Sequence, residues 1–157
     1  MTQPARIPLD SEYWLRPEMG NVHELLTDLL AKEDLESRDV SNFISNLAQS
    51  SDEMELEYFA TIPYLLDLFE AQPKKLQESL VGFSGSLFKN SAPPPDEYWD
   101  PVLDQKERIG RVFFNALCEC KPESELAVAC IAGLAAMFTF PDSAIRLFRL
   151  MCEHQWN

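Results

Sequence analysis

The stretch YFATIPYLLDLF, residues 58–69, is the part of the sequence that decides the fold class. Its large apolar side chains recur at the i, i+4, i+7, i+8 and i+11 positions of a helix, namely at Tyr58, Ile62, Leu65, Leu66 and Phe69. That spacing predicts an amphipathic α-helix with one buried face. A proline inside the pattern, Pro63, predicts a bend or a break in this helix.

Similar apolar stripes run along most of the chain and predict an all-α fold. No segment alternates strictly between apolar and polar residues, as a half-buried strand would. We expect about seven helices, which begin near residues 21, 37, 51, 73, 109, 122 and 142. Pro73 and Pro122 suit the first turn of a helix. Asn21 and Glu24 have the spacing of a capping box.

The domain organisation is expected to be simple. Residues 1–20 contain three prolines and should form an irregular N-terminal arm. Tyr13 and Trp14 lie in that arm, and we expect these two aromatic side chains to pin it to the body of the protein. Residues 21–157 should form a single α-helical domain, because a chain of this length can bury one sizeable core.

An internal repeat relates two of the predicted helical hairpins. The segments LFEAQP, residues 68–73, and LCECKP, residues 117–122, are offset by 49 residues. Each segment ends one apolar helix and opens the next helix with a proline. A period of this size is typical of the stacked helical hairpins of an α-solenoid.

The spacing Ala-x-x-Pro-x-Leu-x-x-Leu at residues 60–68 resembles the first helix of HEAT-like repeats. The resemblance covers about residues 54–152, but the tight turns lack the Asp and Arg that many HEAT repeats carry there. It implies a short solenoid of antiparallel hairpins. Short acidic proteins of this style also resemble bacterial immunity proteins encoded beside polymorphic toxins, which implies a role in neutralising a toxin.

The charge of the chain is unevenly distributed along the sequence. Residues 1–105 hold seven of the 13 basic residues and twenty of the 26 acidic ones, so the whole net charge of −13 lies there. Between Arg38 and Lys74 there are seven carboxylates and no basic side chain. A pI near 4.4 argues against binding to nucleic acid or to an anionic membrane. The bias either keeps the protein soluble or forms an acidic face for a basic protein partner.

Two segments are the best candidates for that acidic face. One is a carboxylate cluster before the Tyr58 stripe, and the other is a loop in which an aromatic side chain is surrounded by carboxylates. Carboxylates around a desolvated aromatic anchor are typical of a binding hot spot. Alternatively, the first segment is a solvated helix face, and the aromatic residues of the second cover an edge between helices. The predicted partner-binding residues are Glu53, Glu55, Glu57, Asp96, Glu97, Trp99 and Asp100.

The sequence offers little that predicts catalysis. His23 and His154 are the two histidines, and neither stands at a metal-ligand spacing from another histidine or a cysteine. The four cysteines fall within apolar helical patterns, and we expect them to be buried, reduced thiols. We therefore expect no catalytic residues, no metal and no cofactor. Without a signal peptide or an apolar run of membrane-spanning length, we expect a cytoplasmic protein.

These patterns favour a non-catalytic protein-binding module. The sharpest hypothesis is an immunity protein that neutralises a basic toxin domain, for example a nuclease, by covering its active site. Two alternatives stay open at this point. One is an adaptor or secretion chaperone that holds a client protein in a helical groove, and the other is a helical enzyme or ligand-binding protein whose pocket the sequence hides. The sequence leaves open whether the protein is a monomer or a homodimer.

Overall fold

The protein is all-α over the residues that its computed structural model describes, which are 6–17, 20–48, 56–88 and 105–138. These residues contain six α-helices and two short 3-10 helices, and no strand. In chain order the elements are η1 (Glu12–Leu15), α1 (Val22–Ala31), α2 (Ser37–Ala48), α3 (Leu56–Ala71), η3 (Gln77–Ser79), α4 (Leu80–Phe88), α6 (Lys106–Glu119) and α7 (Glu125–Phe138).

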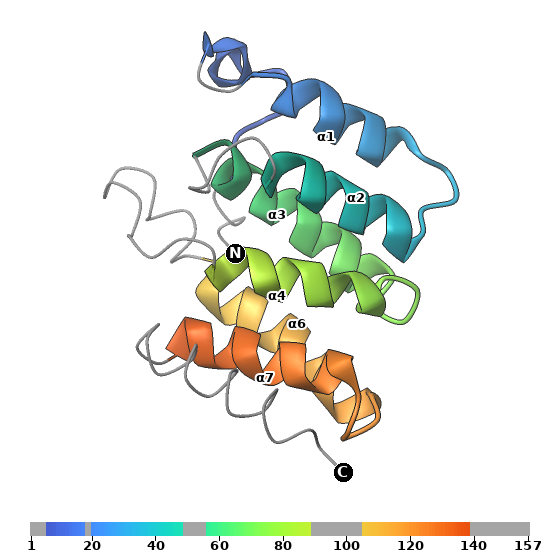
Figure 1. Ribbon diagram of the computed structural model, residues 1–157. Coiled ribbons are helices and arrows are strands. Elements are labelled where there is room, and N and C mark those ends of the chain that lie inside the picture. The colour runs from blue at the N-terminus through green and yellow to red at the C-terminus, as the bar shows by residue number, and fades with distance from the viewer. Residues whose placement is uncertain (1–5, 18–19, 49–55, 89–104, 139–157) are drawn as a thin grey trace.

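The helices lie in two layers (Figure 1). Helices α2, α4 and α7 lie side by side in one layer, and α3 and α6 lie behind them in the other. Helix α1 lies at one end of the stack and packs against both α2 and α3. The most extensive contacts join α6 to α7 and α4 to α7. Among neighbours in sequence, α1 packs against α2 and α6 against α7, while α4 lies between α2 and α7.

Three aromatic rings connect helices α3, α4 and α6 through the core. Phe69 of α3 packs on Phe83 of α4 with ring centroids 5.2 Å apart, and Phe83 stacks on Phe113 of α6 at 5.6 Å. All three side chains are buried. Because aromatic pairs bury large areas and favour defined ring geometries, this row of rings fixes how the hairpins sit on one another.

The predicted helix within residues 58–69 is confirmed, and it is continuous. Helix α3 runs unbroken through Pro63, so a break at that position is ruled out. The apolar stripe lies in the core, since Ile62, Leu65 and Leu66 are fully buried. The missing amide hydrogen of Pro63 costs one hydrogen bond, and burial of the surrounding stripe offsets that cost.

Two predicted helix starts are wrong, and the structure gives a reason for each. The segment after Pro73 is a turn followed by η3, and α4 begins only at Leu80. There Ser79 donates both its amide and its hydroxyl hydrogen to the carbonyl of Leu76, which holds a tight turn instead of an α-helix. Helix α7 begins at Glu125 rather than at Pro122, because the hydroxyl of Ser124 accepts a capping hydrogen bond from the amide of Ala127.

The first α-helix begins where the sequence predicts, but without the predicted capping box. Asn21 precedes α1, yet its side chain makes no capping hydrogen bond. Its backbone has φ −101° and ψ 16°, outside the extended conformation that aims an N-cap side chain at the next turn. The expected helix from residue 142, and the loop of residues 90–101, lie outside the described residues.

The N-terminal arm is held to the helices by its aromatic side chains and by its carbonyl groups. Trp14 is 2% exposed and lies against Tyr64 of α3 with ring centroids 6.4 Å apart, which confirms its predicted role as an anchor, and its Nε1 donates to the carbonyl of Pro8 within the arm at 2.9 Å. Tyr13 is half-buried. The imidazole Nε2 of His23 hydrogen-bonds the carbonyl of Leu9 at 2.8 Å. These contacts satisfy backbone groups of a segment that makes no long helix of its own.

One glycine is required by the close packing of α6 on α7. A Cβ atom added to Gly133 would lie 2.5 Å from Cε2 of Phe113, far inside normal contact. The ring cannot swing away freely, because it is buried and stacked on Phe83. Gly82, on the exposed side of α4, has no atom within 4 Å of the corresponding position.

We predict that Gly133→Ala lowers the free energy of unfolding by about 1–3 kcal/mol, because the added methyl group overpacks the core. The matched control, Gly82→Ala, should raise it by up to about 1 kcal/mol, because alanine favours the helix more than glycine. Urea denaturation followed by circular dichroism measures both values. Equal effects of the two substitutions would contradict the packing described here.

Candidate functional site

The structure does not test the seven predicted binding residues. Glu57 lies in the first turn of α3, and nothing is described of its side chain. The other six lie outside the described residues: Glu53, Glu55, Asp96, Glu97, Trp99 and Asp100. Their role in binding stays a prediction.

A pocket opens where the connection between α3 and α4 passes over α6. Its volume is about 330 Å³. Phe69 reaches it from the end of α3 and Leu80 from the start of α4, while Val112 and Ala116 come from α6. The turn and η3, which replace the helix expected after Pro73, contribute Pro73 and Gln77 to the pocket lining.

The polar side chains that line the same pocket include two carboxylates and no cation. They are Glu70, Gln77, Asn115, Cys118 and Glu119. Glu119 is exposed and pairs with no side chain in the described part of the chain. The pocket therefore combines an apolar wall with an acidic rim.

The other rim carboxylate, Glu70, is held in place by an arginine. Arg108 Nε donates to Glu70 at 2.7 Å, and its two terminal nitrogens donate to Asp67 at 2.8 Å and to the Gln105 side chain at 2.8 Å. The hydrogen bond to Glu70 is the main reason why the pKa of Arg108 lies above its ordinary value. Arg6 of the N-terminal arm makes a second ion pair with Asp67. The arm, α3 and α6 are thus joined beside the pocket.

The sequence analysis missed this network. Arg108 and Glu70 are 38 residues apart in the chain, and no spacing rule relates them. The sequence does contain one indication of an ion pair here. Asp67 and Glu70 are two carboxylates three residues apart on one helix, and the stretch around them has no basic residue. Such a pair favours a cation from another element, because like charges at this spacing repel.

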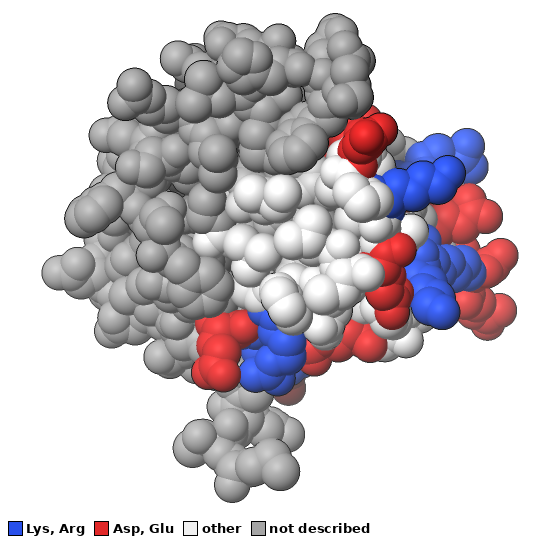
Figure 2. Space-filling model, turned by 90° about the horizontal axis from the view of Figure 1, so that it is seen from below, with Lys and Arg blue, Asp and Glu red and all other residues white. Residues whose placement is uncertain are grey.

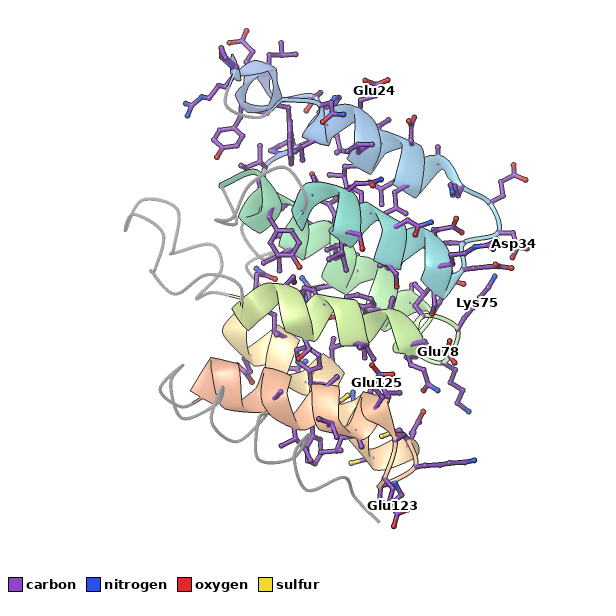
Figure 3. All side chains as sticks on the ribbon, viewed as in Figure 1. Glu24, Asp34, Lys75, Glu78, Glu123 and Glu125 are labelled. Carbon is purple, nitrogen blue, oxygen red and sulfur yellow. The ribbon has the colours of Figure 1, made fainter. Side chains whose placement is uncertain are left out.

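Further carboxylates lie along the edge of the stack where the hairpins turn (Figure 3). We call this the turn edge and define it by the exposed residues Glu33, Asp34, Glu36, Glu78, Glu123 and Glu125. Lysines lie among them, and Lys75 pairs with Asp34. Seen from the α7 end of the stack, the described surface is uncharged over its middle and carries charged side chains at its margin (Figure 2).

The prediction that all the cysteine thiols are buried is wrong, because the described thiols differ in their exposure. Cys118 is exposed at the pocket, Cys120 is half-buried and Cys130 is buried, and all three are free. Burial raises the pKa of Cys130 to about 12, so this thiol stays protonated at neutral pH. Cys152 lies outside the described residues.

The described residues contain no group of three or more His, Cys, Asp or Glu side chains arranged to hold a metal ion. None of the helices among them combines the length and the hydropathy that crossing a bilayer requires. Comparison of the chain with protein-family models, with curated proteins and with solved structures yields no match.

The ion pairs of Asp67 predict a pH-dependent contribution to stability. Burial raises the pKa of Asp67, but the hydrogen bonds from Arg6 and Arg108 together outweigh this effect. The pKa of Asp67 therefore lies below its ordinary value of 3.8. A carboxylate with a depressed pKa in the folded state stabilises the protein above its unfolded-state pKa. That stabilisation is lost as the pH falls through the folded-state pKa.

We predict that Asp67→Asn lowers the free energy of unfolding at pH 7 by about 1 kcal/mol, a value discounted for the partial exposure of the pair. The difference from the unchanged protein should shrink toward zero as the pH falls through the folded-state pKa of Asp67, which lies below its ordinary value of 3.8. Chemical denaturation at several pH values measures this. Asp28→Asn, on the exposed side of α1, is the control and should change little. A difference that stays constant with pH would refute the ion-pair explanation.

Proposed function

We propose that this chain is a non-catalytic module that binds a basic protein. The observation that carries the proposal is the net charge of −13, all of it contributed by residues 1–105. Like charges concentrated in one part of a protein repel one another and destabilise the compact state. Attraction of a basic partner by an acidic surface would explain why the protein keeps a charge distribution that destabilises it.

The particular hypothesis is an immunity protein that acts in the cytoplasm and covers the active site of a basic toxin domain. Electrostatic attraction would steer the two proteins together and raise the association rate, and occlusion would then block the toxin. The hairpin layers support the proposal that the chain is a short HEAT-like solenoid, a fold that presents an extended binding surface. The residues proposed to bind remain Glu53, Glu55, Glu57, Asp96, Glu97, Trp99 and Asp100.

A second candidate is an adaptor or secretion chaperone that holds a client protein. The apolar wall of the pocket favours it, as do two exposed large apolar side chains, Leu15 at 78% and Phe114 at 55%. A client held mainly by apolar contacts would dissociate little when salt is added, whereas a steered ion-paired partner would dissociate readily. Salt dependence therefore separates the two functions.

The test is capture of partners from the source cell by the immobilised full chain, at low and at high salt, with mass spectrometry. We predict one basic protein, bound in stoichiometric amount, that high salt weakens. Replacing the six proposed carboxylates by their amides should reduce its capture about tenfold or more, because several charge pairs are lost together. If the captured protein is an enzyme, one equivalent of the chain should abolish its activity.

The matched control replaces six other exposed carboxylates by their amides, so that both variants lose the same net charge. These carboxylates make no ion pair with a described side chain, and they are Glu24, Asp28, Glu33, Glu36, Glu78 and Glu123. Circular dichroism confirms that both variants fold. A captured partner that is indifferent to salt and to the carboxylate variant would contradict the acidic-face proposal. That outcome would favour the adaptor.

A further inference from the structure

The pocket beside α6 has a lining that selects for a particular kind of chemical group. Its wall is apolar, formed by side chains such as Phe69, Leu80 and Val112. Both charged side chains that line it, Glu70 and Glu119, are acidic. An anion would be repelled there, and a purely apolar group would desolvate the carboxylates without pairing them. A group with an apolar body and a cationic end satisfies both parts of the lining.

The two carboxylates are not equivalent. Glu70 already accepts from Arg108 at 2.7 Å, and this hydrogen bond holds it at the pocket. Glu119 lies one turn beyond Asn115 on α6, is exposed, and has no ion-pair partner among the described side chains. Glu119 is therefore the carboxylate that is available to an incoming cation, because the charge of Glu70 is largely offset by Arg108.

The size of the pocket narrows the choice of occupant. About 330 Å³ is at the lower end of the range for pockets that take small ligands, and it is more than one side chain fills. Arginine is enriched at the centres of protein interfaces, where its planar group stacks on aromatic rings and pairs with carboxylates. An arginine next to an apolar residue would supply both the volume and the charge.

We infer that this pocket receives an arginine and an adjacent apolar side chain from the basic protein partner. The arginine would pair with Glu119, and the apolar side chain would lie against Phe69, Leu80 and Val112. This inference rests on the proposed function, since it names where and how the basic partner is held. It adds a binding site to the seven predicted residues, which lie on other segments of the chain.

The test uses benzamidine as the probe, because it joins an aromatic ring to a cation that resembles the arginine head group. We predict that benzamidine shifts the amide resonances of residues 112–119 and of Leu80 in ¹⁵N-labelled full chain, with saturation at millimolar concentrations. Benzamide has nearly the same shape without the charge, and it should bind at least about threefold more weakly, as expected for the loss of one exposed ion pair. Equal binding of the two probes, or shifts spread over the whole protein, would overturn the inference.

Substitutions at two exposed residues of the pocket, each with a control substitution elsewhere, test the inference further. Glu119→Gln should weaken benzamidine binding about threefold and leave benzamide unchanged, whereas Glu123→Gln, outside the pocket lining, should change neither. Asn115→Trp should block the mouth of the pocket and abolish binding of both probes. Asn46→Trp, on an exposed face of α2, is its control.

The same variants distinguish failure of this inference from failure of the proposed function. In the capture experiment, Asn115→Trp should reduce binding of the basic protein at least tenfold relative to Asn46→Trp. Undiminished capture by Asn115→Trp, with the salt dependence retained, would overturn the pocket inference and leave the acidic face as the binding site. Absence of any basic partner in the capture experiment would instead count against the proposed function, whatever benzamidine does.

Discussion

The row of stacked rings formed by Phe69, Phe83 and Phe113 is the contact on which the rest of the structure depends. These rings belong to three different helices and lie 5.2 and 5.6 Å apart, so they set the register of one hairpin on the next. Gly133 allows α7 to approach the far side of the row. Phe69 is also part of the pocket wall, so the same packing that holds the core fixes one side of the candidate site.

A polar network supports the site from the other side. Arg108 is only 16% exposed as a side chain and joins Glu70 to Asp67, which in turn holds Arg6 of the N-terminal arm. An arginine in this position must be paired, because burying part of its charge without partners would be costly. The network therefore joins the N-terminal arm, α3 and α6, and it holds Glu70 at the pocket.

The sequence predicted the helices well because their apolar stripes are long, and the stripe from Tyr58 to Phe69 is buried as expected. It misplaced the starts of α4 and α7, because local hydrogen bonds of Ser79 and Ser124 outweighed the preference of proline for a first helical turn. The pocket could not be predicted, since it arises where α3, α4 and α6 meet. The bond from Arg108 to Glu70 was likewise hidden, because only the packing of the hairpins brings them together.

We propose that a basic protein is held at the acid-rimmed pocket between α3, α4 and α6. The first measurement to make is hydrogen–deuterium exchange of the full chain, alone and with the basic protein that it captures. We predict slower exchange on binding in residues 69–80 and 112–119 together, because both segments line the pocket. A tightly bound partner that leaves exchange in both segments unchanged would contradict the claim.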